Sequence, residues 1–580
     1  MAAKPTGTVG SLSGVDPSRL GPDTRRRALR RLGDETLDVL VIGGGITGVG
    51  CALDAATRGL DVGLIEQRDL ASGTSSRSSK LIHGGLRYLE RLDLRLVAEA
   101  LHERTLLLHL APHLVHPLPF LYPLRRHWER LYVGAGVLLY DLLAASGSNP
   151  LPRHRHLGRR SMLREFPDLD PEAFVGAIRY WDAQTDDARY VAVLARTAAR
   201  HGASIAPSVR AVGLLRRGDR VVGVRAVDLE RGAELEIRAR VVVNATGVWT
   251  DDVEAMAGDT ERLVIASKGI HLVVPGERIR GTTGLITRTE KSVLFVIPWD
   301  GHWLIGTTDT PWRLHRAHPA ANRTDIEYLL DHVNRILARP LGARDLVGVY
   351  AGLRPLVAGD AAATEKLSRE HVVTRPRPGL LTVAGGKFTT YRVMAADALD
   401  AAAGDLGRLP PSVTDRISLV GADGYAAVWN TRERIARERG LPVPVVERLL
   451  RRYGSLVGEL FALIDDDPSL GEPLPGGAGH LRAELRHAVS HEGALHLDDL
   501  LTRRTHISIE EPDRGVTAAH AAAPLVADLL GWDARTVARE IEHYEARVAA
   551  ELESQRMPDD RTADAARMGA PDVRVGLADD

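Results

Sequence analysis

Closely spaced glycines followed by an acidic residue are the first feature of this sequence that suggests chemistry. Gly43, Gly45 and Gly48 in GGGITG have the G-x-G-x-x-G spacing, which lets a backbone turn tightly and approach a pyrophosphate at the positive end of the next helix. Glu66 follows about 20 residues later, where a carboxylate can accept hydrogen bonds from ribose hydroxyls. These residues predict a dinucleotide-binding site.

A strand, a turn, a helix and a second strand must position those residues. The segment DVLVIGGGITGVGCALDAATRGLDVGLIEQRDL, from Asp38 to Leu70, has this layout. A G-x-G-x-x-G pattern alone is weak, but with both strands, the helix and the terminal acid it predicts a βαβ unit. The unit does not distinguish NAD from FAD.

Two later segments favour FAD. A strand of β-branched residues ends in NATG, and a helix is predicted to start at Asp251 and Asp252. Strand, Gly-Gly and helix return in LLTVAGGKFTTYRVMAADALDAA, where Lys387 follows Gly385 and Gly386. A helix N-terminus and a cation there would stabilise the negative charge of a reduced flavin. An ordinary helix entry is the alternative interpretation of Gly-Gly-Lys taken alone.

Length and composition set limits on the function. The 580 residues, 44% of them hydrophobic, are enough for two or three domains. Because 75 Lys and Arg balance 76 Asp and Glu, no global field attracts nucleic acid, which is not an expected partner. The single cysteine, Cys51, excludes a disulfide framework and Cys-based metal clusters, and no metal site is predicted. Redox chemistry therefore needs an organic cofactor.

The nucleotide-type segments near residues 40, 245 and 385 predict a discontinuous domain. The alternating segment VLFVIPWDGHWLIGTTD predicts an antiparallel hairpin, and the periodicity after Pro410 is helical. We expect an N-terminal extension (1–35), an FAD-binding domain (36–110, 190–265 and 345–405), a substrate domain (111–189 and 266–344), a helical C-terminal cap domain (406–550) and a disordered tail (551–580).

Several motifs together resemble one family. DVLVIGGGITG, TSSRSSKLIHGGLRYLE, VVNATGVW, FVIPW with IGTTDT, YAGLRPL and VAGGKFTTYR occur in this order between residues 36 and 405. They are similar to the FAD-dependent (respiratory) sn-glycerol-3-phosphate dehydrogenases, and the helical C-terminal region resembles the cap domain of that family. The resemblance implies an α/β fold: a Rossmann-like FAD-binding domain of the glutathione-reductase or D-amino-acid-oxidase type, an inserted antiparallel-sheet substrate domain and a helical C-terminal domain.

The activity that this resemblance implies is oxidation of sn-glycerol 3-phosphate to dihydroxyacetone phosphate. Hydride would pass to flavin N5 and the electrons then to a membrane quinone. FAD is expected to be bound noncovalently, because Cys51 lies inside the first predicted helix, as a small buried hydrophobe, and no family attachment residue is present.

The motifs and the resemblance predict which residues contact FAD. Ser75, Ser76, Ser79 and Lys80 can bond the pyrophosphate or the flavin edge, or can hold the loop, and the two roles are compatible. His83 is assigned to the flavin loop rather than to proton transfer. The predicted contacts are Gly43, Gly45, Ile46, Thr47, Gly48, Glu66, Thr74, Ser75, Ser76, Ser79, Lys80, Leu81, His83, Gly84, Gly85, Ala245, Thr246, Gly247, Gly385, Gly386, Lys387 and Thr389.

Recognition of a phosphate dianion in a water-poor cleft calls for guanidinium groups. Arg87 in GGLRYLE and Arg354 in AGLRPL match substrate-site positions of the family, and Arg369 in KLSREHV matches a third in a looser alignment. Elsewhere in this arginine-rich chain, a solvated surface charge is the default interpretation.

Hydride transfer from C2 also requires loss of the hydroxyl proton, so a base must lie close by. His271 in KGIHLVVP matches an active-site histidine of the family and is the first choice. Lys387, Thr308 and Asp309 are alternative members of a proton relay, and the sequence does not rank them. Together with Arg354, these residues are the predicted catalytic group.

The stretch RRHWERLYVGAGVLLYDLL, from Arg125 to Leu143, places basic and aromatic residues beside a short apolar run. Such a composition suits a bilayer interface, although a buried helix of the substrate domain is an equal alternative. Residues 1–35 lack the apolar core of a signal peptide, and no run has the ~18 to 20 apolar residues of a spanning helix. We expect a cytoplasmic protein, peripheral on the inner face of the cytoplasmic membrane, and a homodimer is compatible with such a patch.

Three other functions remain alternatives. A glycerol-3-phosphate oxidase would use oxygen on the same fold, and no residue pattern decides the acceptor. An FAD-dependent 2-hydroxy acid dehydrogenase is weakened by the number of candidate phosphate-binding arginines. His271, Arg354 and Lys387, in otherwise matching motifs, argue against a non-catalytic flavin-binding module.

Overall fold

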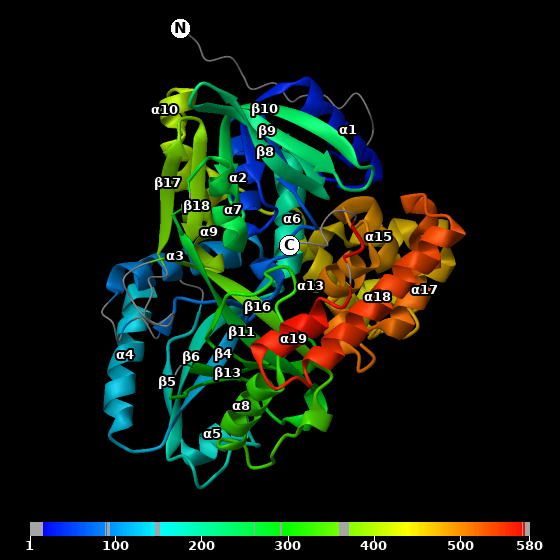
Figure 1. Ribbon diagram of the computed structural model, residues 1–580. Helices are drawn as coiled ribbons and strands as arrows, with labels where there is room; N and C mark the ends of the chain where they lie inside the picture. The colour runs from blue at the N-terminus through cyan, green and yellow to red at the C-terminus, as the bar shows by residue number, and fades with distance from the viewer. Residues whose placement is uncertain are drawn as a thin grey trace.

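Two β-sheets form the body of the molecule, and a helical C-terminal domain covers one side of both (Figure 1). The computed structural model describes residues 16–86, 89, 93–144, 151–259, 261–290, 293–358, 370–570 and 572–574. Within these residues, every helix is too short or too polar to span a bilayer.

The first sheet has a parallel centre, as the predicted dinucleotide-binding unit requires. β18, β10, β1, β2 and β7 run parallel, whereas β17 and the β8–β9 hairpin are antiparallel additions. In sheet order the strands are β17 (His371–Arg377), β18 (Leu380–Gly385), β10 (Ala233–Asn244), β1 (Thr36–Ile42), β2 (Val62–Glu66) and β7 (Ser204–Pro207), with β8 (Val209–Arg217) and β9 (Arg220–Asp228) beside β10. The carboxyl ends of the three predicted nucleotide-type strands are therefore neighbours.

Alternating residues of β1 fill the cores on the two faces of this sheet. Val39 and Val41 pack under α2 (Ile46–Thr57), α6 (Asp187–Arg200) and α9 (Tyr391–Ala401). Leu40 and Ile42 face α1 (Pro22–Asp34), α7 (Thr250–Met256) and the β8–β9 hairpin. This is the two-residue period of a strand buried on both sides. Most of the described part of the predicted N-terminal extension (1–35) is thus α1, a helix that packs on the first sheet.

The second sheet is mixed and mostly antiparallel. Its strands in order are β15 (Thr310–Trp312), β11 (Val264–Pro275), β14 (His302–Gly306), β13 (Val293–Trp299), β12 (Gly284–Arg288), β4 (Val115–Leu124), β6 (Gly176–Thr185) and β3 (Leu81–Ile82), with β16 (Gly348–Val357) beside β11 and β5 (Arg155–Gly158) beside β6. The predicted hairpin is confirmed as β13 and β14. The predicted domain boundary at 345 is wrong, because β16 pairs with β11 along most of its length.

Helices cover both faces of the second sheet. α8 (Arg323–Asn334) and α5 (Arg159–Glu165) pack on the face that carries Ile270, Leu272 and Val274. α3 (Leu94–Leu110) and α4 (Glu129–Ala144) pack on the opposite face, which carries Val273. Because side chains alternate along β11, Ser267, Gly269 and His271 share the face of Val273.

The chain after Pro410 is helical, as predicted. The main helices are α11 (Tyr425–Asn430), α12 (Arg432–Arg439), α13 (Val443–Tyr453), α14 (Val457–Asp466), α15 (Arg482–Glu492), α16 (Ile507–Glu510), α17 (Val516–Leu530), α18 (Ala534–Ser554) and α19 (Asp560–Arg567). In Figure 1 these helices, from yellow to red, lie to one side of the two sheets.

The prediction of a disordered tail is wrong for its described residues. α19 begins at an Asp559 N-cap, and Ala563 is buried against Trp312 of the second sheet. Further on, Asp572 pairs with Arg68 at 3.1 Å and Arg574 with Asp499 at 2.9 Å, with each of the four side chains at most 7% exposed. Their partners lie far away in the sequence, so composition alone could not reveal the order.

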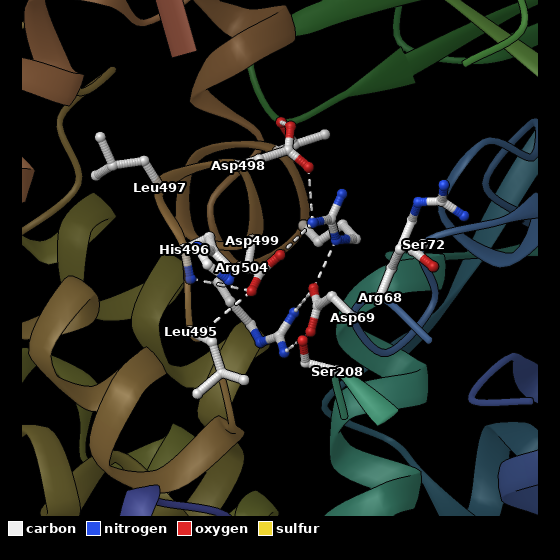
Figure 2. Close-up of polar contacts among 12 residues, drawn as sticks. Arg68, Asp69, Ser72, Ser208, Leu495, His496, Leu497, Asp498, Asp499 and Arg504 are labelled. Atoms are coloured by element: carbon white, nitrogen blue, oxygen red, sulfur yellow. Dashed lines mark hydrogen bonds and ion pairs between the residues drawn. The ribbon is translucent and has the colours of Figure 1, made fainter. Parts of the chain in front are cut away.

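Buried ion pairs join the cap domain to the first sheet. Asp69, just after β2, accepts from Arg503 Nε at 2.5 Å and from Arg504 Nη2 at 2.7 Å. Figure 2 shows Asp69, Asp498 and Asp499 turned toward guanidinium groups at this contact. Removing one member of such a pair would leave a buried charge uncompensated, so breaking this contact singly is costly.

Candidate active site

A cavity of about 270 Å³ lies where the glycine-rich turns of the first sheet converge. Its position beyond the carboxyl ends of β1, β2, β10 and β18 is where open α/β sheets bind ligands. More than half of the predicted FAD contacts line it, namely Gly43, Gly45, Ile46, Thr47, Glu66, Thr74, Ser75, Ala245, Thr246, Gly247, Gly385, Gly386 and Lys387.

The glycines of the first turn are required by close backbone contacts. Gly43 has φ +113°, and a Cβ atom there would lie 2.6 Å from the Ala245 carbonyl oxygen. A Cβ atom on Gly48 would lie 2.0 Å from the Gly43 carbonyl oxygen, so Gly48 brings α2 against the turn rather than lining the cavity. The N-terminus of α2 at Ile46 lies in the cavity wall, where it favours an anion such as a pyrophosphate.

Glu66 stands at the end of β2, where the sequence placed a ribose-binding carboxylate. Its Oε2 accepts from the Gly44 amide at 2.6 Å and its Oε1 from the Arg68 amide at 2.8 Å. Burial raises the pKa of Glu66 above its ordinary value, while the two backbone amides oppose the shift. The carboxylate is thus held rigidly at the cavity wall.

Other predicted FAD contacts hold the surrounding loop. The Lys80 ammonium is fully buried against the Asp187 carboxylate and the Ser76 carbonyl oxygen, so the side chain has the loop-holding role, and a cofactor contact through its backbone stays a prediction. Thr389 Oγ1 accepts from the His83 amide at 3.2 Å, and the Gly84 amide donates to Tyr140 Oη at 2.8 Å.

A second cavity, of about 120 Å³, lies against the second sheet. Polar and glycine residues occupy part of its wall: Ser79, His83, Gly85, Asp182, Thr307, Asp309 and Arg354. Most of the remaining wall is apolar or aromatic: Leu81, Leu86, Phe120, Tyr180, Ile286, Val293 and Phe295. A charged group bound here would be largely shielded from water, which strengthens its ion pairs.

Strand register brings the predicted catalytic residues together. On β16, Arg354 lies opposite Ser267 and Tyr350 lies opposite His271. On the other side of β11, Gly306 at the end of β14 is the partner of His271. Segments 267–271, 306–309 and 350–354 therefore meet on one face of the sheet.

His271 is a buried, neutral imidazole. Its Nε2 lies 2.8 Å from Ser79 Oγ, and its ring stacks on Tyr350 with the centroids 4.8 Å apart. Burial lowers the pKa of His271 to about 3, and the charges of Arg354 and Lys80 act in the same direction. Its Nδ1 has no hydrogen-bond partner among the described residues. A neutral imidazole with an unused nitrogen can accept a proton.

Arg354 is positioned by the end of β14. Its Nη2 donates to Thr307 Oγ1 at 2.9 Å and to the Thr308 carbonyl oxygen at 3.2 Å, and its Nη1 lies 3.7 Å from Asp309 Oδ1. A Cβ atom on Gly269 would lie 2.3 Å from Arg354 Nη2. The missing side chain at this position therefore makes room for the guanidinium.

Thr308 and Asp309, the alternative relay residues, are engaged in structural contacts. Thr308 Oγ1 accepts from the Ile270 amide at 3.1 Å, and Asp309 accepts from the Ser267 hydroxyl. Lys387 lines the larger cavity. Arg87 and Arg369 lie outside the described residues.

Sequence reasoning missed Tyr350, Thr307, Ser267 and Gly269. Tyr350 lies four residues before Arg354 on β16, and Thr307 precedes Thr308 in IGTTDT. Ser267 and Gly269 alternate with His271 along β11. The two-residue period of a strand shows which residues share a face with His271. It does not show which residues of the neighbouring strand lie opposite them, because the register between strands is not contained in the sequence.

Comparison with known proteins agrees with this architecture. Residues 38–392 match the family model described as FAD dependent oxidoreductase, and residues 412–537 match the C-terminal domain of alpha-glycerophosphate oxidase. Two sheets with a cavity at converging glycine turns are the form expected of such an oxidoreductase, and FAD is the cofactor.

Proteins of similar sequence identify the family within the class of FAD-dependent oxidoreductases. Glycerol-3-phosphate dehydrogenase 2 of Mycobacterium tuberculosis is 54% identical over 568 residues, 97% of each chain. The mitochondrial glycerol-3-phosphate dehydrogenase of Homo sapiens is 38% identical over 89% of this chain and 74% of the human one. The chain thus belongs to the FAD-dependent glycerol-3-phosphate dehydrogenase family.

A solved structure extends the similarity to the fold. The glycerol-3-phosphate dehydrogenase of Bacillus halodurans, complexed with FAD, superposes with a TM-score of 0.75 at 29% identity. The match covers 91% of this chain and 98% of the other.

Proposed function

We propose that the enzyme oxidises sn-glycerol 3-phosphate at C2 to dihydroxyacetone phosphate and passes the electrons to a membrane quinone. The observation that carries the proposal is the placement of Arg354 and neutral His271 on paired strands of one sheet face, beside the FAD-domain loop. The names of the similar dehydrogenases support the choice of substrate.

Arg354 supplies the charge that recognises the phosphate. Its guanidinium lines a cavity of about 120 Å³, a size suited to a three-carbon phosphate ester. The apolar wall raises the strength of the charge-assisted hydrogen bonds. The Thr307 hydroxyl and the Thr308 carbonyl fix the guanidinium before the substrate arrives.

His271 accepts the C2 hydroxyl proton in this proposal, and FAD, when bound, accepts the hydride from C2. Because the Arg354 charge depresses the pKa of His271, a phosphate dianion paired with Arg354 offsets part of that effect. The substrate thereby makes His271 a stronger base at the moment when a base is needed. Ser79 and the stacked Tyr350 hold the ring in place.

α4 supports a membrane location. Trp128, Leu131, Tyr132, Leu138 and Leu142 are between 50% and 80% exposed on one side of the helix and at its start. The opposite face is buried, and its Tyr140 hydroxyl contacts the flavin loop at Gly84. One face of α4 is therefore buried in the substrate domain, while the other leaves apolar side chains exposed. Arg125 and Arg126, at the N-terminal end, suit anionic headgroups.

We infer from this patch that the enzyme docks on the inner face of the cytoplasmic membrane. A quinone is confined to the bilayer, while a three-carbon phosphate ester is soluble in water, so the enzyme must work at their boundary. A second copy of the chain covering the same patch is the competing occupant. In that case the protein would be a dimer that does not bind vesicles.

The electron acceptor is tested by reoxidation of the substrate-reduced enzyme. We expect a water-soluble quinone analogue to reoxidise it much faster than air-saturated buffer, with little hydrogen peroxide formed. Peroxide in a one-to-one ratio with dihydroxyacetone phosphate would instead identify an oxidase, the function after which the matching C-terminal family model is named.

A further inference from the structure

A third cavity lies between the cap domain and the flavin loop, and arginines dominate its wall. It has a volume of about 90 Å³. The arginines that face it are Arg77, Arg503, Arg514, Arg547 and Arg567, and the carboxylates are Asp498 and Glu551. Five guanidinium groups and two carboxylates leave a surplus of three positive charges. We call this the interdomain arginine cavity.

Its arginines differ in how their charges are balanced. Arg503 is held by Asp69, Asp498 and Asp499, which belong to the network in Figure 2. Arg567 Nη2 is 3.5 Å from Glu551 Oε2. The other three arginines form no salt bridge within the part of the chain that the structure describes.

The three arginines without a carboxylate contact neutral groups. Arg77 donates to the Ala317 carbonyl at 3.2 Å, and Arg514 donates to the Val347 carbonyl. Arg514 is 5% exposed, and its Nε has no hydrogen-bond partner among the described residues. Arg547 contacts the ring of His318, whose pKa burial and Arg547 itself hold well below the ordinary value. His318 is therefore neutral and adds no further positive charge.

These charges cannot be removed by deprotonation. Burial lowers the pKa of Arg77 to about 9, with Arg503, Arg567 and Arg547 acting in the same direction. Burial also lowers the pKa of Arg514 and of Arg567. A guanidinium nevertheless keeps its proton in proteins, so the cluster stays charged at neutral pH. Arg514 and Arg567 are buried, whereas Arg77 and Arg547 are partly exposed. Burying charge of one sign is costly unless a counterion is present.

We propose that the interdomain arginine cavity binds a free tetrahedral oxyanion of the size of inorganic phosphate. Arg514, Arg547 and Arg567 contribute from the cap domain and Arg77 from the flavin loop. Guanidinium groups match the oxygen spacing of such an anion. A volume of about 90 Å³ accommodates such an ion.

The bound anion links cap docking to the active site. Arg77 lies two residues before Ser79, whose hydroxyl contacts His271. Between them, the carbonyl oxygen of Ser78 accepts a hydrogen bond from the hydroxyl of Tyr350. Arg77 does not line the cavity that holds Arg354, so the two anion sites are separate. An anion on Arg77 would fix the loop that positions the proposed base.

Thermal unfolding of the FAD-bound enzyme tests the proposal. Inorganic phosphate, compared with chloride at equal ionic strength, should raise Tm by about 2 to 4 °C at saturation. The rise should persist in Arg354→Met, which removes the proposed substrate-phosphate contact, and in Arg539→Met, an exposed arginine on α18. It should disappear in Arg514→Met.

Two further readings keep the test decisive. In chloride, Arg514→Met should be at least as stable as the wild type, because the substitution removes an uncompensated charge. Crystals of the wild type grown with selenate should show the anomalous selenium signal in this cavity. An equal phosphate response in wild type and Arg514→Met, or no selenium in the cavity, would overturn the proposal. Equal stabilisation by glucose 6-phosphate would overturn the assignment to a free ion.

Discussion

Gly269 decides where the Arg354 guanidinium can lie, because any side chain there would overlap it. If Arg354 binds the substrate phosphate, Arg354→Met should lower kcat/KM by an amount equivalent to about 2 to 5 kcal/mol. Gly269→Ala should reproduce much of this loss by displacing the same group. Steady-state kinetics with a dye acceptor, together with the flavin content of each variant, measures both.

Matched controls separate displacement from general damage. Gly458→Ala adds a methyl group where the space is open, and Arg344→Met removes an exposed arginine close in sequence. Both should retain wild-type kcat/KM. Near wild-type values for Arg354→Met and Gly269→Ala would mean that Arg354 does not bind the substrate.

His271 also predicts a pH dependence of stability. Its pKa is about 3 in the folded chain against 6.5 as the ordinary value. Between these values the unfolded chain binds a proton that the folded chain does not, so the free energy of unfolding falls as pH drops from 6.5 toward 3. His271→Asn should therefore lose less Tm than the wild type between pH 7 and pH 5. Parallel Tm profiles for the two proteins would contradict a buried neutral His271.

The residue types of the site were predictable, but their contacts were not. His271 and Arg354 were found because KGIHLVVP and AGLRPL match active-site positions of the family that the sequence resembles. Ser267, Gly269 and Tyr350 act only through the register of β11 with β16, which sequence spacing does not contain. The carboxylate partner of Lys80 was not predictable, because Asp187 lies 107 residues away in the chain.

At the scale of elements, α4 carries the clearest prediction. Paired substitutions Trp128→Glu and Leu138→Glu place charge on an exposed apolar surface, so binding to vesicles with anionic lipids should fall at least tenfold. Co-sedimentation measures it. Val212→Glu, on β8 of the first sheet, is a matched control at another exposed hydrophobic residue.

The outcomes distinguish the occupants of this surface. Equal binding by the double variant and the wild type would move the membrane contact elsewhere. Loss of a dimer in the double variant, with no vesicle binding by the wild type, would identify a second copy of the chain as the partner instead.

Elements with strong local signals were predictable, and those defined by distant partners were not. The β13–β14 hairpin follows from the alternation of apolar and polar residues within a single segment. β16 was assigned to the wrong domain because its long pairing is with β11, far away in the sequence. α19 was missed because a charged, alanine-rich segment is ordered here by packing on Trp312 and by its N-cap.

At the scale of the whole molecule, His496 joins the cap domain to the first sheet. Its Nδ1 lies 2.9 Å from Glu540 on α18 and its Nε2 2.9 Å from Glu230 after β9. Although burial and Arg574 act to lower it, the hydrogen bonds to Glu230 and Glu540 raise the pKa of His496 to about 10. A protonated His496 can donate to both carboxylates.

The sign of the resulting pH effect follows from the raised pKa. The stabilisation is fully present below pH 6.5 and is lost as pH rises toward 10, because only the folded chain holds the proton in that range. Between pH 7 and pH 9, Tm should fall more in the wild type than in His496→Gln. The exposed His520→Gln should behave like the wild type. An identical decline in all three proteins would contradict a protonated His496 at this contact.

Reduction of the bound flavin by substrate in the absence of oxygen tests the central claim most directly. Titrating the purified yellow holoenzyme anaerobically with sn-glycerol 3-phosphate should bleach the flavin absorbance and form one dihydroxyacetone phosphate per flavin reduced. Glycerol and lactate should leave the absorbance unchanged, because neither carries a phosphate for Arg354. A flavin that stays oxidised with sn-glycerol 3-phosphate, or that glycerol or lactate bleaches equally well, would contradict the account.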